Sequence, residues 1–284
     1  MIIKNQEKAE MLTREERVRE IQKFTLLSDV FMSVALEDIP ACEHVLRIFT
    51  GKKELTLRRV KTQYSISKIA TKSVRLDVLA EDICGALYAI EVQRKASVDH
   101  ARRVRFYSAM TDSSLLGKGE GYSGMPDRYI FYVSETDIWK VDRTVCHVSK
   151  SLTEGQKPCL RLYEDGSHVT YINAQVDDGS EVAALMRYFK TADPEDDSQG
   201  ALSRRVKFLK SEEGGVERMC ELTDMIEKRG ELRGENRGRQ EGKRAVAINL
   251  AGMGMTVERI AQAVEENVSV VRQWLSAESL SENR

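Results

Sequence analysis

The stretch SVRLDVLAEDICGALYAIEVQRK, residues 73–95, decides the fold class. Apolar and polar residues alternate on both sides of a break at residues 81–85, and this period of two is typical of β-strands. Because the break is several residues long and contains Gly85, the pattern predicts an antiparallel hairpin with a loop between its strands.

The sequence on either side of this hairpin predicts an α/β fold. Further strands are indicated by short runs rich in Val, Ile and Tyr, at residues 55–66, 128–134, 144–150 and 167–173. Apolar residues at helical spacing predict flanking helices at 26–49, 97–116 and 181–210. The first helical pattern is interrupted near Pro40, because proline can open a helix but disrupts its interior.

The composition divides the chain into four predicted segments. Glycine recurs every four residues from Gly230 to Gly242 among Glu and Arg, and such a stretch buries no core of its own. We therefore expect a polar helical leader at 1–25, a main domain at 26–212, a charged spacer helix or linker at 213–243, and a small trihelical, helix-turn-helix-like unit at 244–277.

The charge balance excludes one class of nucleic-acid binder. Lys and Arg number 44 against 45 Asp and Glu, so the net charge of −1 is unlike that of a uniformly basic, histone-like protein. A polyanion would have to bind to a local basic surface.

Cysteine usage and hydropathy indicate a cytoplasmic protein. The five cysteines are scattered without a C-x-x-C pair and the four histidines are dispersed, so the sequence indicates no zinc cage. Free thiols suit a reducing compartment. The first twenty residues lack the apolar core of a signal peptide, and no uncharged run approaches the roughly 18 residues of a membrane span. We expect no membrane partner.

Two acids of the predicted hairpin are the candidate chemical site. Thirteen residues separate Asp77 on the first strand from Glu91 on the second, about the length that two short strands and a turn require. Strand alternation puts Glu91 and Gln93 on one face, and it puts Asp77 on the face opposite its apolar neighbours. The pattern therefore predicts that two carboxylates and an amide converge.

Converging acidic oxygens suit Mg²⁺, an oxygen-preferring ion that keeps several waters when a protein binds it. A metal held in this way can activate water and neutralise charge on a phosphodiester. The alternative interpretation is that both acids face solvent on an exposed strand.

This hairpin, with an arginine-bearing helix after it, resembles the PD-(D/E)XK nuclease superfamily. More closely, residues 26–228 resemble the PD-(D/E)XK nuclease family transposases, through stretches such as VKTQYSIS, ARRVRFYSAM and DRYIFYVSETD. The resemblance implies a restriction-endonuclease-like mixed sheet flanked by helices, with a small all-α C-terminal tail. It also implies a Mg²⁺-dependent DNA endonuclease that promotes recombination, with Mn²⁺ as a substitute ion, DNA as the partner, and a homo-oligomer left open.

One position departs from the superfamily pattern. Gln93 stands where a lysine is commonest, and its neutral amide can hydrogen-bond but cannot supply charge. Lys95 lies further along the same face by parity and is a candidate source of that charge. With Asp77 and Glu91 as metal ligands, the side chain of Glu91 or Gln93 would orient the attacking water.

The resemblance further implies an acid on the first core helix, where Asp29, Glu37, Asp38 and Glu43 are candidates and Asp29 fits best. A first-turn Asp that stabilises the helix dipole is an equal alternative. On the helix after the hairpin, Arg103 and Tyr107 are four residues apart and share a face, which the resemblance puts beside the active site. There Arg103 would meet a phosphate, with Tyr107, Arg94 and Lys95 nearby as further DNA contacts. An arginine packed on the tyrosine ring is the alternative.

Other interpretations stay open at the level of sequence. A DNA-binding or scaffold protein that has lost efficient cleavage is the main alternative, because Gln93 replaces lysine; cleavage of RNA is a third. Gly119, Gly121 and Gly124 match a dinucleotide fingerprint by letters but precede a predicted strand instead of following one, so no nucleotide cofactor is expected.

Overall fold

We describe the protein from a computed structural model, for residues 14–66, 74–94, 99–116, 119–154 and 157–281. The chain divides into two compact units, residues 1–219 and residues 220–284, and each is described by itself.

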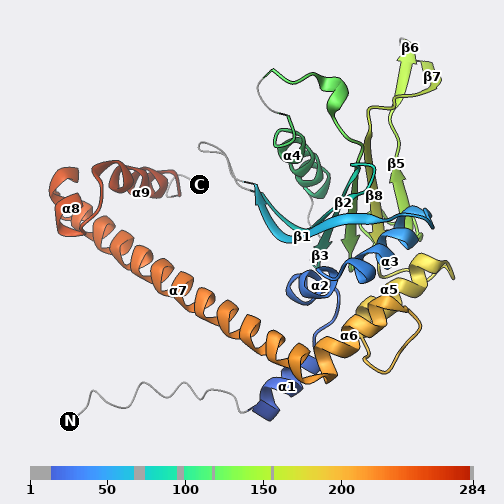
Figure 1. Cartoon of the computed structure of the whole chain (residues 1–284). Coiled ribbons are helices and arrows are strands. Elements are labelled where there is room, and N and C mark those ends of the chain that lie inside the picture. The colour runs from blue at the N-terminus through green and yellow to red at the C-terminus, as the bar shows by residue number, and fades with distance from the viewer. Residues whose placement is uncertain (1–13, 67–73, 95–98, 117–118, 155–156, 282–284) are drawn as a thin grey trace. The chain divides into compact units, whose positions relative to one another are not determined.

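A six-stranded mixed sheet forms the centre of the first unit (Figure 1). Its strand order is β1-β2-β3-β4-β8-β5, in which β1, β2 and β3 are antiparallel, β3, β4 and β8 are parallel, and β5 returns antiparallel to β8. The bounds are β1 Leu57–Ile66, β2 Val74–Asp82, β3 Leu87–Gln93, β4 Arg128–Ser134, β5 Val145–Val148 and β8 Ser167–Asn173. The predicted hairpin is β2–β3, and the predicted α/β class is confirmed.

Helices cover both faces of the sheet. α4 (His100–Asp112) packs on one face, where its Val104 joins Ile130 and Tyr132 in an apolar cluster. On the opposite face the Phe49 ring of α3 (Ile39–Thr50) lies 5.1 Å from the ring of Phe131. The other helices of this unit are α1 Arg14–Gln22, α2 Asp29–Leu36, α5 Glu181–Thr191 and α6 Ala201–Ser211.

The predicted interruption near Pro40 has a local cause. α2 ends at Leu36, and the Asp38 side chain caps the next helix by accepting the main-chain N–H of Ala41 at 3.0 Å. Pro40 lies in the first turn of α3, where its missing N–H costs nothing. Gly51 then ends α3 in the left-handed conformation (φ 69°), which glycine adopts without strain.

One small sheet was not anticipated. β6 (Ser151–Glu154) and β7 (Lys157–Leu162) form a separate antiparallel pair, and a single turn of 3₁₀ helix, η1, covers Tyr122–Gly124. β6 has only four residues and β7 contains Pro158, so neither carries a long alternating pattern.

The second unit is helical. α7 (Glu213–Gly252) begins within the first unit and is continuous over 40 residues. The glycines that recur every four residues lie within it, although each lowers helix stability. Its C-terminal part packs through Ala247 against Ile260 of α8 (Val257–Ala263) and Val271 of α9 (Val268–Ser281). The predicted division into four segments stays a prediction. No helix within the described ranges combines the length and apolar character needed to cross a bilayer.

Candidate active site

The β2–β3 ladder gives way to side-chain hydrogen bonds at the two candidate acids. Its last register pair is Val78 with Ile90, and the next two positions are Asp77 and Glu91. Glu91 Oε1 accepts the main-chain N–H of Asp77 at 3.2 Å, and Asp77 Oδ2 accepts the main-chain N–H of Val92 at 3.0 Å. Both residues are buried, with 6% and 3% of their surfaces exposed. The hairpin therefore brings the two carboxylates together.

Strand alternation does not run unbroken through Asp77. Leu76 and Leu79, three residues apart, pack in one cluster with Met110 of α4, although alternation assigns them to opposite faces. On the neighbouring strand, Gln63 has a positive φ of 50° and falls between two register pairs, as Asp77 does. The two strands are thus distorted together at the acid.

Gln93, Arg103 and Tyr107 form one chain of hydrogen bonds beside the acids. Arg103 Nη1 donates to Gln93 Oε1 at 2.6 Å, and Arg103 Nε donates to the Tyr107 hydroxyl at 3.1 Å. The guanidinium carbon also lies 5.1 Å from the centre of the Tyr107 ring. Arg103 thus packs on the tyrosine, as the alternative interpretation expects, and at the same time reaches the residue in the lysine position.

The acids are held in an unfavourable electrostatic setting. Burial raises the pKa of Asp77 to about 6, with a further contribution from the charge of Asp29. Burial, together with the charge of Asp77, raises the pKa of Glu91 well above its ordinary value. Arg103 and Arg75 only partly offset these effects. Two buried acids that resist simultaneous ionisation are typical of a functional site.

Residues 45–176 match the family described as PD-(D/E)XK nuclease family transposase. The chain contains a PD-(D/E)XK nuclease family transposase domain. The matched range includes Asp77, Glu91, Gln93 and Arg103, and the observed mixed sheet with flanking helices is consistent with this fold. The predicted family is therefore confirmed for the domain at residues 45–176. No curated protein and no solved structure matches the chain.

Asp29 begins α2 and lies before the range that matches the nuclease family. Its Oδ1 accepts the N–H of Val30 at 2.9 Å, and its Oδ2 lies 3.6 Å from Arg75 Nη2. About half of its side chain is exposed. These contacts are typical of an acid in the first turn of a helix. The charge of Asp29 also contributes to the raised pKa of Asp77.

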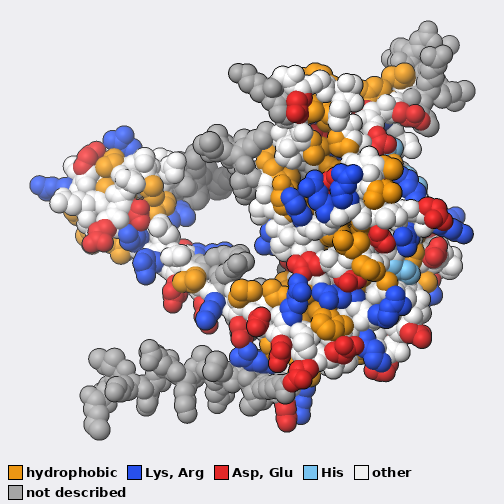
Figure 2. Space-filling view, in the orientation of Figure 1, with side chains coloured by type: hydrophobic (Ala, Val, Ile, Leu, Met, Phe, Trp, Pro, Cys, Tyr) orange, Lys and Arg blue, Asp and Glu red, His pale blue; other side chains and the backbone are white. Residues whose placement is uncertain are grey.

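The other predicted DNA contacts of the nuclease domain differ in their surroundings. Arg94 is exposed and its Nε donates to Glu135 at 3.2 Å. Lys95 lies outside the described residues. On the face seen in Figure 2, basic side chains lie among acidic ones over this domain and do not form one continuous basic surface.

Two neighbours of the acids were not predicted from the sequence. Arg75 forms an ion pair with Asp29, and its charge works to lower the pKa of both buried acids. Tyr132 lies beside Glu91 in the β3–β4 register, and its buried hydroxyl has no hydrogen-bond partner among the described residues. The sequence RYIFYVS does not indicate that Tyr132 lies beside Glu91. Their proximity depends on which strand pairs with β3 and in which register.

The acid pair of the nuclease domain fits a divalent cation that takes only one or two ligands from the protein. Within the described ranges, no group of three His, Cys, Asp or Glu side chains is arranged to hold a metal. The two main-chain hydrogen bonds use Glu91 Oε1 and Asp77 Oδ2, which leaves the second oxygen of each carboxylate as a candidate ligand. A cation bound by one or two carboxylates and by water is typical of Mg²⁺ sites.

Proposed function

We propose that this chain is a Mg²⁺-dependent DNA endonuclease in which Asp77 and Glu91 hold the metal. The observation that carries the proposal is the buried acid pair, whose shared main-chain bonds fix both carboxylates in place. Burying two like charges is costly without a compensating cation. A divalent ion at this place would lower both pKa values and supply Lewis-acid activation of water and charge neutralisation at the phosphodiester.

Gln93 and Arg103 together would take the place of the superfamily's lysine. Gln93 holds the guanidinium at 2.6 Å, and the charge of Arg103 acts on both acids. Arginine stays charged and offers several donors to a phosphate, so it can stabilise negative charge on the substrate. The Glu91 or Gln93 side chain would orient the attacking water, with Asp29 as an additional acid beside the pair.

The substrate proposal rests on the family. DNA cleavage by a transposase-family nuclease would promote recombination, and Mn²⁺ would replace Mg²⁺ because it accepts the same oxygen ligands. Arg94 and Lys95 would contact the DNA backbone.

The test is cleavage of supercoiled plasmid with Mg²⁺ or Mn²⁺. We expect the parent chain to nick or cut it, and we expect Asp77→Ala to abolish cleavage while DNA binding persists. Glu81→Gln is a matched control, because Glu81 lies on the same strand but pairs with Arg58 and Arg59 at the surface. It should cleave like the parent.

A second candidate is a DNA-binding protein that keeps the fold but has lost cleavage, which the neutral Gln93 favours. Binding of DNA without cleavage in any divalent ion would support this candidate and refute the nuclease.

A further inference from the structure

The main chain of Asp77 is held by side chains from two directions. Its N–H donates to Glu91 Oε1 at 3.2 Å, and its carbonyl oxygen accepts from the Ser33 hydroxyl at 3.3 Å. Ser33 lies on α2 and is only 2% exposed, so this contact is buried. The candidate acid is therefore supported from β3 on one side and from α2 on the other.

The strand ladders on both sides of β2 omit Asp77. The β1–β2 ladder pairs the residues before and after Gln63 and Asp77 but not these two, and the β2–β3 ladder ends at Val78. Gln63 also adopts a φ of 50°, a left-handed conformation that is energetically costly for a residue other than glycine. The position of Asp77 therefore depends on its side-chain contacts more than on the ladders.

The side chain of Gln63 fixes the direction of the Ser33 hydroxyl. Gln63 Nε2 donates to Ser33 Oγ at 2.6 Å. Because an amide nitrogen can only donate, Ser33 accepts in this contact and its own proton is left for another acceptor. Two main-chain carbonyl oxygens offer that acceptor, Asp29 O at 2.5 Å and Asp77 O at 3.3 Å from Ser33 Oγ. Gln63 thereby directs the hydroxyl toward both carbonyls.

Ser33 links the two elements that carry candidate acids. Its hydroxyl contacts the main chain of Asp29, the first residue of α2, and the main chain of Asp77 on β2. Gln63 adds β1, so three elements meet at one hydroxyl group. The contact leaves the carboxylate of Asp77 to the Val92 N–H and to a cation. Ser33 and Gln63 therefore act on where Asp77 lies without contributing a charge.

We propose that Ser33 and Gln63 are positioning residues of the nuclease site, which fix the main chain of Asp77 so that its carboxylate is directed at the metal. The inference rests on the proposed function for the metal at Asp77. Residues that orient a metal ligand through hydrogen bonds typically contribute about 10- to 100-fold to metal affinity or activity. The strained φ of Gln63 is then a consequence of bringing its amide group to Ser33.

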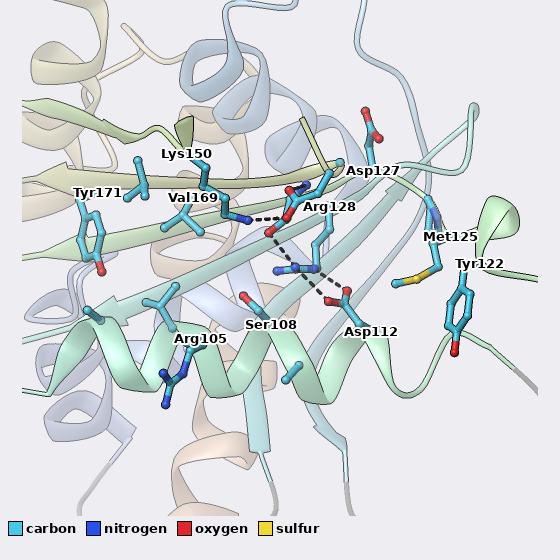
Figure 3. A pocket seen from close by; sticks show the side chains of 18 of the residues that line it. Arg105, Ser108, Asp112, Tyr122, Met125, Asp127, Arg128, Lys150, Val169 and Tyr171 are labelled. Carbon is cyan, nitrogen blue, oxygen red and sulfur yellow. Dashed lines mark hydrogen bonds and ion pairs between the residues drawn. The ribbon is translucent and has the colours of Figure 1, made fainter. Parts of the chain in front are cut away.

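A cavity of about 910 Å³ along α4 lies apart from this arrangement (Figure 3). Ser33, Gln63 and Asp77 are not among the residues that line it. At its wall, Arg128 Nε and Nη2 donate to Asp112 at 2.8 and 3.1 Å, an ion pair that joins β4 to α4. This pair offers a control, because weakening it should lower stability without moving Asp77.

Amide hydrogen exchange of the metal-free chain tests this support directly. The Asp77 N–H donates to Glu91 and the Val92 N–H donates to Asp77, so both amides report how Asp77 is held. Gln63→Gly removes the side-chain amide and introduces the residue that adopts a φ of 50° without strain. Both amides should exchange about five- to tenfold faster, the scale of one lost hydrogen bond. The denaturation midpoint should stay near that of the parent, because relieved strain offsets the lost contact.

Calorimetric titration with Mn²⁺ connects the support of Asp77 to the metal. In the full chain, Gln63→Gly and Ser33→Ala should each bind Mn²⁺ about tenfold more weakly than the parent. Ser33→Ala removes only the hydroxyl group and keeps a residue that favours helix within α2.

Two control variants separate positioning from a general loss of stability. Ser65→Gly introduces glycine at an exposed position of the same strand, β1, and Asp112→Asn weakens the pair with buried Arg128. Each should lower the denaturation midpoint. Both should leave the exchange of the Asp77 and Val92 amides and the Mn²⁺ affinity like those of the parent.

Unchanged exchange of the Asp77 and Val92 amides in Gln63→Gly would overturn the proposal. Faster exchange throughout the domain, with a lower denaturation midpoint, would also overturn it, because Gln63 would then have only a structural role. Faster exchange of the two amides with Mn²⁺ affinity equal to that of the parent would show that Gln63 holds the strand and not the metal ligand, which is a third contradiction.

Failure of the proposed function is a separate result. A parent chain that binds no Mn²⁺ would refute the metal site, whereas the exchange measurement contains no metal and still decides whether Ser33 and Gln63 hold Asp77.

Discussion

Glu91 Oε1 accepts the main-chain N–H of Asp77 at 3.2 Å, so the two candidate metal ligands are joined directly across the hairpin. Asp77 in turn accepts from Val92, the residue after Glu91. Each carboxylate is thereby fixed by the partner strand while it stays buried beside a like charge. The fold holds an arrangement that costs stability, and this cost has measurable consequences.

Asp77→Asn should stabilise the metal-free chain. The substitution keeps the side-chain shape and an acceptor for the Val92 N–H, but it removes a buried negative charge next to Glu91. We expect the free energy of unfolding at pH 8 to rise by on the order of 1–2 kcal/mol, in the direction typical of a relieved active site. Urea denaturation measures it. A loss of stability would show that the charge is compensated in the folded chain.

The stability of the metal-free chain should fall as pH rises. The pKa of Asp77 is about 6 in the folded chain against an ordinary 3.8, so between these values the folded state binds more protons than the unfolded state. The free energy of unfolding therefore decreases from about pH 4 to about pH 6. The raised pKa of Glu91 extends the decrease upward. Denaturation midpoints across this range check it, and a slope unchanged in Asp77→Asn would exclude Asp77 as its source.

Arg103→Met should lower cleavage by about 10–100-fold, because the charge beside both acids is lost. Arg103→Lys should retain part of the activity, since it keeps a charge but not the planar contact with Gln93. Single-turnover cleavage rates and DNA affinity should be measured together. A change confined to affinity would make Arg103 a DNA anchor.

Gln93→Lys should not raise cleavage on its own. A lysine ammonium there would lie against the Arg103 guanidinium, which now donates to Gln93 at 2.6 Å. Combined with Arg103→Met, the lysine should recover much of the lost rate. A double-mutant cycle measures this coupling, and additive effects would argue against one shared role for the two residues.

Asp29→Asn separates the two interpretations of that residue. If Asp29 completes the site, the substitution should weaken metal affinity while the helix stays intact. If it serves only α2, thermal stability should fall slightly, by about 0.3–1 kcal/mol at a helix N-terminus, with metal affinity unchanged.

Much of the fold could be predicted from the sequence, because its signals are local. They are the period-two alternation over 73–95 and the helix boundaries marked by Pro40 and Gly51. The convergence of Asp77 and Glu91 followed from the same alternation. Alternation does not hold across Asp77 in β2, since Leu76 and Leu79 pack in one cluster. The irregularity in β2 occurs together with the positive φ of Gln63 on β1. No local sequence pattern predicts such a change in two strands.

Features that depend on tertiary pairing could not be predicted. Tyr132 is a neighbour of Glu91 only because β4 pairs parallel to β3 in one register. Arg128 and Asp112 are sixteen residues apart and meet only when α4 packs on the sheet.

The most direct test of the account is calorimetric titration of the full chain with Mn²⁺ in buffers of different ionisation enthalpy. We predict one site whose occupation releases protons near pH 6, because binding ionises carboxylates whose pKa values are raised. Asp77→Asn combined with Glu91→Gln should abolish both binding and proton release. Unchanged binding in that variant would place the ion elsewhere and contradict the account.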